Sequence, residues 1–165
     1  MDADILLEKA KTFVEEKINE IMFIHRSFGG WERWFQLSFA YYLSSTYVVD
    51  TEVVYQNRRI DLSIQDENME DHYVEIKCLG DTQLITESIN QFVNGVFEDI
   101  DKQQHAQLIG DKYCMVVIPN DINGVGCKVF QFISNSVKTE QYENVIERIV
   151  FSRDQSIAVV LYEII

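Results

Sequence analysis

Two stretches between Arg58 and Cys78 alternate apolar and polar residues, and this alternation limits the folds open to the chain. The first is RRIDLSI and the second is HYVEIKC, with the polar connector QDENMED between them. Successive side chains of a strand point to opposite faces, so each stretch predicts a strand with one apolar face. The connector predicts a hairpin. The polar face would collect Arg59, Asp61, Glu75 and Lys77.

Pairing of these strands would bring Asp61 and Glu75 together, with Lys77 one pleat further along. Two neighbouring carboxylates repel each other unless a cation lies between them. Mg²⁺ (or Mn²⁺) suits such a pair, because it takes oxygen ligands and completes its shell with waters and a phosphate substrate. A lysine on the same face could orient a metal-activated water or help to deprotonate it, which is sufficient for phosphodiester hydrolysis. An isolated E-x-K pattern would indicate only a solvated Glu–Lys pair.

The spacing of Asp61, Glu75 and Lys77 resembles the D…(D/E)-x-K core of the PD-(D/E)xK nuclease superfamily, which includes restriction endonucleases, Holliday-junction resolvases and repair nucleases. The resemblance begins upstream at GWERWFQLSFAYYL, residues 30–43, and covers about Gly30 to Lys77. Many members carry an acid and a glutamine on the helix before the first core strand, and Glu32 and Gln36 stand at those positions. Ile60 precedes Asp61 where the motif has proline.

This resemblance implies a restriction-endonuclease-like fold and a set of roles. Asp61 and Glu75 would bind the metal together with the Ile76 carbonyl, and Lys77 would position the attacking water. Glu32 would reach the metal through water or support a second ion, and Gln36 would orient the nucleophile or an acid that binds the metal. Superfamily members often present a lysine or glutamine from the helix after this motif. For Asp101, Lys102 and Gln103 on that helix, a solvated face is the preferred interpretation.

The charge of the chain argues against a nucleic-acid partner. It has 14 lysines and arginines against 27 acids, a net charge of −13. Nucleic-acid binders usually carry a basic surface that contacts phosphates. Metal ions, a local basic patch or a partner subunit would reconcile the charge with binding of DNA. Arg58 and Arg59 could bind a phosphate bidentately or neutralise nearby acids.

Two other interpretations remain open. The chain could be a non-catalytic acidic accessory or decoy protein, on a nuclease-like fold, that binds a protein partner. It could also hydrolyse another phosphate ester. Metal uptake separates the first of these from a nuclease, because a decoy needs no metal.

Apolar spacing along the chain predicts one α/β domain over residues 1–165, with a mixed central sheet flanked by helices (αβββαβ core). It divides into an added N-terminal helix (1–26), a core (30–119) and a C-terminal helix and strand (120–165). The N-terminal helix could pack outside the core or in a homodimer interface. The predicted elements are helices over 3–24, 31–44, 89–108 and 139–150, strands over 47–55, 58–64, 72–78, 113–118 and 156–165, and either type over 128–133.

Several features indicate a cytoplasmic protein. No stretch approaches about 18 uncharged apolar residues, so no membrane span is expected. The N-terminus has acids at Asp2 and Asp4 and no basic region, unlike a signal peptide. Cys78, Cys114 and Cys127 form no C-x-x-C pair and lie in apolar runs, which predicts buried free thiols in a reducing compartment.

Overall fold

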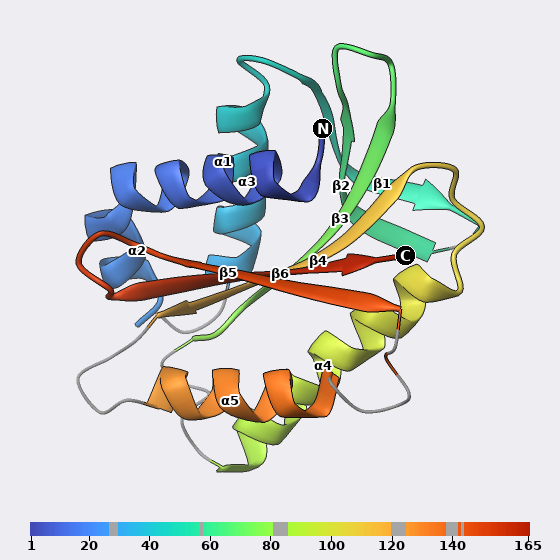
Figure 1. Cartoon of the computed structure of the whole chain (residues 1–165). Coiled ribbons are helices and arrows are strands. Elements are labelled where there is room, and N and C mark those ends of the chain that lie inside the picture. Colours follow the sequence, from blue (N-terminus) through green and yellow to red (C-terminus); the bar gives the residue numbers. More distant parts are fainter. Residues whose placement is uncertain (27–29, 57, 81–85, 120–124, 138–141, 143) are drawn as a thin grey trace.

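A computed structural model describes residues 1–165 except 27–29, 57, 81–85, 120–124, 138–141 and 143 (Figure 1). Helices open the chain, and strands follow with helices inserted among them. In chain order they are α1 (Ala3–Glu16), α2 (Ile18–Ile24), α3 (Trp31–Leu43), β1 (Val48–Tyr55), β2 (Arg58–Gln65), β3 (Asp71–Cys78), α4 (Thr86–Gln104), β4 (Asp111–Pro119), α5 (Val125–Val137), β5 (Val145–Phe151) and β6 (Ile157–Ile164).

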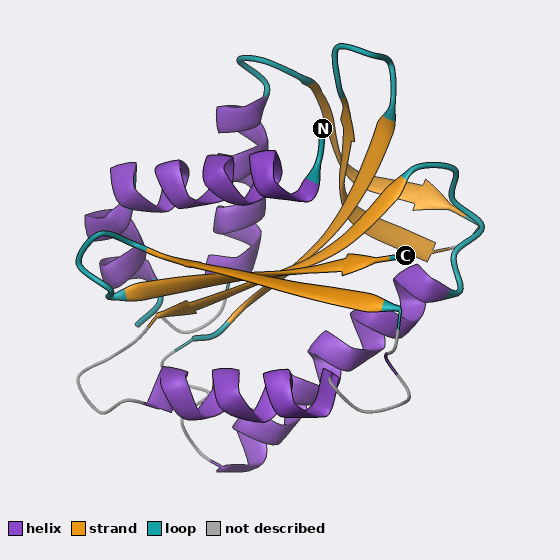
Figure 2. Ribbon diagram, viewed as in Figure 1, coloured by secondary structure: helices purple, strands orange, loops and turns teal. Residues whose placement is uncertain are grey.

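The six strands form one mixed sheet in the order β1-β2-β3-β4-β6-β5. β3 and β4 are parallel and are joined through α4, whereas every other neighbouring pair is antiparallel. Helices α1 and α3 cover one face of the sheet, and α4 and α5 cover the other (Figures 1 and 2). The predicted mixed sheet with helices on both faces is confirmed.

The alternation in β2 and β3 sorts their side chains as the sequence predicts. Leu62, Ile64, Val74 and Ile76 are fully buried and pack in the core beneath α1 and α3. The central strands β4 and β6 are buried along nearly their whole length, because helices cover both of their faces. Their near-continuous apolar runs follow from this position.

Two of the predicted elements differ from the structure. The predicted helix over 3–24 is interrupted at Lys17, whose φ of −105° and ψ of 10° separate α1 from α2. The apolar spacing continues across Lys17, so the pattern gave no sign of the break. The predicted helix over 139–150 is wrong for its second half, because β5 pairs with β6 as an edge strand. Residues 138–141 and 143 lie outside the described part.

The physical reason for the second error is local. Val145 and Ile149 stand four residues apart, as in a helix, but the segment VIERIV is rich in β-branched residues, which favour strands. The pairing of this segment with β6 decides in favour of a strand over a helix. Residues 128–133, which fitted either type, lie in α5.

Two further findings concern membrane spans and cysteines. Within the described part of the chain, no helix is both long enough and apolar enough to cross a membrane. Cys78 and Cys114 are free and buried, as expected. The Cys127 side chain is outside the described part.

Candidate functional site

Asp61 lies where the pairing between β2 and β3 ends. The paired residues run from Gln65 and Asp71 to Leu62 and Val74, and both strands continue beyond them. The Asp61 carboxylate accepts a hydrogen bond from the backbone N–H of Ile76 across a distance of 2.8 Å. A side chain therefore replaces a backbone contact at this point, and the carboxylate is held against β3.

Glu75 is a buried acid, with 2% of its surface exposed. Its Oε1 atom forms an ion pair with Nζ of Lys102 from α4. Burial raises the pKa of Glu75 to about 8, and the negative charge of Asp61 adds to the rise, while Lys102 opposes it. A further cation near this carboxyl group would therefore favour its ionised form.

Lys77 links the helices on the two faces of the sheet. Its Nζ lies 3.2 Å from Oδ2 of Asp99 on α4 and 3.8 Å from Oε1 of Glu32 on α3. Burial alone would lower the pKa of Lys77, but Asp99 and Glu32 raise it above its usual value. Lys77 is therefore a cation at neutral pH, which favours orienting a water or a phosphate over accepting a proton.

Glu32 reaches this cluster from the first turn of α3. The helix begins after Gly30, whose φ of 82° suits glycine. Glu32 Oε2 accepts a hydrogen bond from the backbone N–H of Cys78 at 3.1 Å, which fixes the side chain at the end of β3. Burial raises the pKa of Glu32, and Lys77 opposes this rise.

The other predicted residues lie less centrally. Gln36 is buried, with 5% exposed, and its side-chain oxygen lies 3.4 Å from NH1 of Arg33. Arg59 forms an ion pair of 3.1 Å with Glu52, so it neutralises an acid in this structure. Arg58 donates a hydrogen bond to the backbone carbonyl of Lys102 at 3.2 Å, which ties the start of β2 to α4.

Sequence reasoning missed the contribution of α4. Lys102 and Asp99 contact the predicted residues Glu75 and Lys77, and the solvated face expected for Lys102 and Gln103 is wrong. A signal was present, because Val96, Asp99, Ile100 and Gln103 recur at i, i+3, i+4 and i+7. Polar residues on an otherwise buried stripe need partners within the protein.

We call Glu32, Asp61, Glu75, Asp99, Lys77 and Lys102 the acidic cluster. Its four carboxylates face two lysines, so the fully ionised cluster has an excess of two negative charges. A divalent cation would balance that excess, and carboxylate oxygens are the donors that Mg²⁺ and Mn²⁺ prefer. A metal ion at Oε1 of Glu75 would compete with Lys102 for this oxygen.

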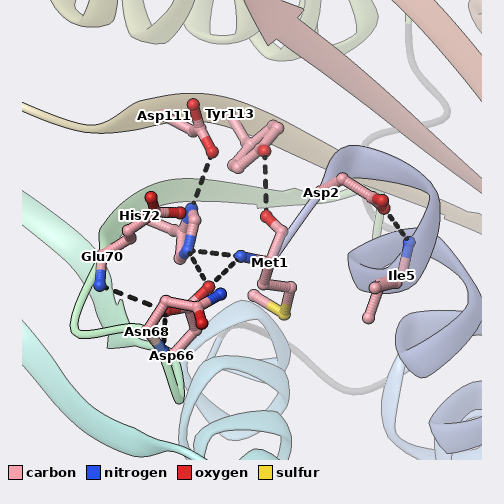
Figure 3. Close-up of polar contacts among 9 residues, drawn as sticks. All are labelled: Met1, Asp2, Ile5, Asp66, Asn68, Glu70, His72, Asp111 and Tyr113. Carbon is pink, nitrogen blue, oxygen red and sulfur yellow. Dashed lines mark hydrogen bonds and ion pairs between the residues drawn. The ribbon is translucent and has the colours of Figure 1, made fainter.

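A second polar cluster joins the N-terminus to the turn between β2 and β3 (Figure 3). The Met1 ammonium donates to Oδ2 of Asp66 and lies 2.7 Å from Nε2 of His72. His72 Nδ1 lies 2.9 Å from Asp111, so we assign the proton to Nδ1 and the acceptor role to Nε2. The bond to the ammonium is the main cause that lowers the pKa of Asp66 below its usual range.

This second cluster also has the composition of a metal site. Asp66, Glu70 and His72 offer ligand atoms within 4.8 Å of one another, the one group of three that the described residues contain. The Met1 ammonium already supplies a positive charge to two of them. We therefore treat it as an internal ion pair that anchors the chain end.

Extending the chain by a Gly-Ser dipeptide before Met1 should lower the melting temperature by several degrees. The extension removes the buried charge that Asp66 binds and leaves the carboxylate without its main partner. Because the pKa of Asp66 is lowered in the folded protein, this stabilisation is fully present only at pH values above the carboxyl's ordinary pKa of 3.8. The melting temperatures of the wild type and the extended protein should therefore converge as the pH falls through and below that value. Differential scanning calorimetry would measure it.

The control is the same dipeptide after Ile165, which is 74% exposed and should leave the melting temperature unchanged. Equal melting temperatures for the two extended proteins at pH 7 would contradict the N-terminal anchor.

Comparison of the chain with protein-family models, with curated proteins and with solved structures found no match.

Proposed function

We propose that this protein is a magnesium-dependent nuclease that hydrolyses phosphodiester bonds of nucleic acid, with DNA as the expected substrate. One observation carries the proposal: Asp61, Glu75 and Lys77, from β2 and β3, meet Glu32, from α3, in one charge-coupled cluster. When this cluster is fully ionised, it has two more negative than positive charges. The order α3-β1-β2-β3-α4-β4 agrees with a restriction-endonuclease-like core. Buried free thiols agree with a cytoplasmic location.

Each residue of the cluster has a role in this proposal. Asp61, Glu75 and the Ile76 carbonyl would hold the ion. When bound, the ion would lower the pKa of a coordinated water and offset the charge of the phosphate. Lys77 would orient the water or the phosphate as a cation, consistent with its raised pKa.

Glu32 and Asp99 would act by positioning. Asp99 holds Lys77 from α4, and Glu32 holds the backbone end of β3 and the same lysine. Two helices on opposite faces of the sheet would thus fix one ammonium group. That fixation limits the side-chain motion that otherwise reduces the effect of a flexible lysine.

The net charge of −13 is compatible with the proposal if the basic groups lie close to the cluster. The elements that build it, α3, β2, β3 and α4, carry Arg33, Arg58, Arg59, Lys77 and Lys102. A bound divalent ion adds two further positive charges at the same place. Binding should therefore depend on the metal more strongly than for a basic nuclease.

The proposal is tested by incubating the protein with single- and double-stranded DNA and RNA, in Mg²⁺, in Mn²⁺ and in EDTA. We expect cleavage of at least one substrate with metal and none with EDTA. Lys77→Met should lower kcat by about 10²–10³-fold, as for loss of one charge-stabilising donor. It should retain stabilisation by Mn²⁺, because the metal ligands remain.

Lys128→Met, which removes an exposed lysine of α5, is the matched control and should cleave as the wild type does. Failure of the wild type to cleave any substrate in either metal would reject the nuclease. The acidic accessory or decoy interpretation would then be retained.

A further inference from the structure

A cavity of about 200 Å³ lies directly beside the acidic cluster. It forms where the end of the β1–β2 hairpin meets the last turn of α4 and the residues after it. Its lining includes Tyr55, Arg58, Lys102, Gln103 and His105. Lys102 belongs both to this cavity and, through its ion pair with Glu75, to the acidic cluster.

The walls of the cavity are held in place by two hydrogen bonds between the hairpin and the helix end. Tyr55 donates its hydroxyl proton to the carbonyl of Gln107 at 2.8 Å, and Arg58 donates to the carbonyl of Lys102 at 3.2 Å. His105 Nδ1 lies 2.7 Å from the Asp101 carbonyl, which leaves Nε2 available as an acceptor. The cavity is therefore preformed.

Gln103 lines this cavity and carries a buried amide. Its side chain is 1% exposed, and neither its amide oxygen nor its amide nitrogen has a hydrogen-bond partner among the described residues. Burying an amide without partners is unfavourable, and native proteins rarely do so without a reason. An amide offers a donor and an acceptor side by side, so its natural complement is a flat group with an acceptor and a donor on one edge.

A nucleobase carries such an edge, and a glutamine binding adenine in two places is a common contact of this type. The volume of about 200 Å³ is smaller than the range of roughly 300–1,000 Å³ for drug-sized ligands, so one heterocycle fits better than a whole nucleotide. Arg58 and Lys102 could then contact a phosphate attached outside. The Tyr55 ring offers a surface on which a base could stack.

We propose that this cavity binds one nucleobase of the substrate strand, next to the phosphate to be cleaved, with Gln103 reading the edge of the base. The inference rests on the proposed nuclease function and names its substrate more closely. A base inside a duplex cannot enter such a cavity, so the substrate is single-stranded or has an unpaired base at this position.

Binding is measured by NMR with the full chain in EDTA, where cleavage cannot occur. The probes are AMP, CMP, GMP and UMP, with ribose 5-phosphate as the probe that lacks a base. We expect at least one nucleotide to bind about tenfold or more tightly than ribose 5-phosphate. The same nucleotide should shift the side-chain amide resonances of Gln103 in the wild type, a readout that needs no variant.

Gln103→Leu should reduce that nucleotide to the affinity of ribose 5-phosphate while melting at the same or a higher temperature, because an unpartnered buried amide is removed. Gln104→Leu, the neighbouring glutamine outside this cavity, should bind as the wild type does. The cavity proposal is overturned if no nucleotide binds better than ribose 5-phosphate, or if Gln103→Leu binds nucleotides unchanged. Base-selective binding without metal-dependent cleavage would overturn the proposed nuclease function and support the base-binding cavity. Metal-dependent cleavage without base-selective binding would support the nuclease function and overturn the base-binding cavity.

Discussion

Asp61→Asn should reduce metal-dependent cleavage by about 10²-fold or more and leave the metal-free protein as stable as the wild type, or more stable. The asparagine oxygen can still accept the hydrogen bond from the Ile76 N–H, now 2.8 Å from Asp61. The substitution removes the negative charge that helps to raise the pKa of Glu75. It also removes a metal ligand, so the stabilisation that Mn²⁺ gives the wild type should disappear.

The measurement is a series of thermal melts with Mn²⁺ and with EDTA, beside the cleavage assay. Asp50→Asn, an exposed carboxylate on the neighbouring strand β1, is the control and should behave as the wild type. Suppose instead that Asp61→Asn strongly destabilises the metal-free protein and that the wild type gains nothing from Mn²⁺. Asp61 would then be a structural acceptor for the Ile76 N–H, and the non-enzyme interpretation would stand.

Glu75 should make the metal-free protein less stable as the pH rises from about 4.5 to about 8. Its pKa is about 8 in the folded protein, against 4.5 for an ordinary glutamate, so the folded state binds the extra proton in this window. The free energy of unfolding should therefore fall by up to about 1.4 kcal/mol per pH unit from this group. Glu75→Gln should remove that slope and be more stable than the wild type at pH 8.

Metal binding at Glu75 must release the same proton, so the Mn²⁺ affinity of the wild type should rise with pH up to about 8. Urea unfolding in EDTA at pH 5, 6.5 and 8, with Mn²⁺ titrations at the same pH values, measures both effects. Glu98→Gln, an exposed carboxylate of α4, should keep the wild-type slope. A wild type and a Glu75→Gln variant with the same slope would show that Glu75 is ionised throughout this range.

The hairpin from Arg58 to Cys78 could be predicted because its information is local. The apolar residues Leu62, Ile64, Val74 and Ile76 alternate strictly, and a one-residue shift would expose all of them. The facing of Asp61 toward Glu75 and Lys77 follows from the same alternation. The prediction that Glu32 lies near these residues required the family resemblance as well, because no local pattern relates the start of a helix to the end of a strand.

The burial of Glu75 could not be predicted from its own strand. An alternating strand predicts one wet face, but α4 packs over that face and brings Asp99 and Lys102 to the acids. Which helix covers a strand is decided by packing across the sheet, on which the spacing within the strand carries no information. The ion pair of Arg59 could not be predicted for the same reason, because its partner Glu52 lies on the neighbouring strand β1.

The most direct measurement of the central claim is the position of Mn²⁺ in crystals of the protein, from its anomalous scattering at pH 8 or above. We predict one peak between Asp61 and Glu75, about 2.1–2.3 Å from a carboxylate oxygen of each, with Lys102 moved away from Glu75. A peak at Asp66, Glu70 and His72 instead, or no peak at the acidic cluster with Lys102 still paired to Glu75, would contradict the account.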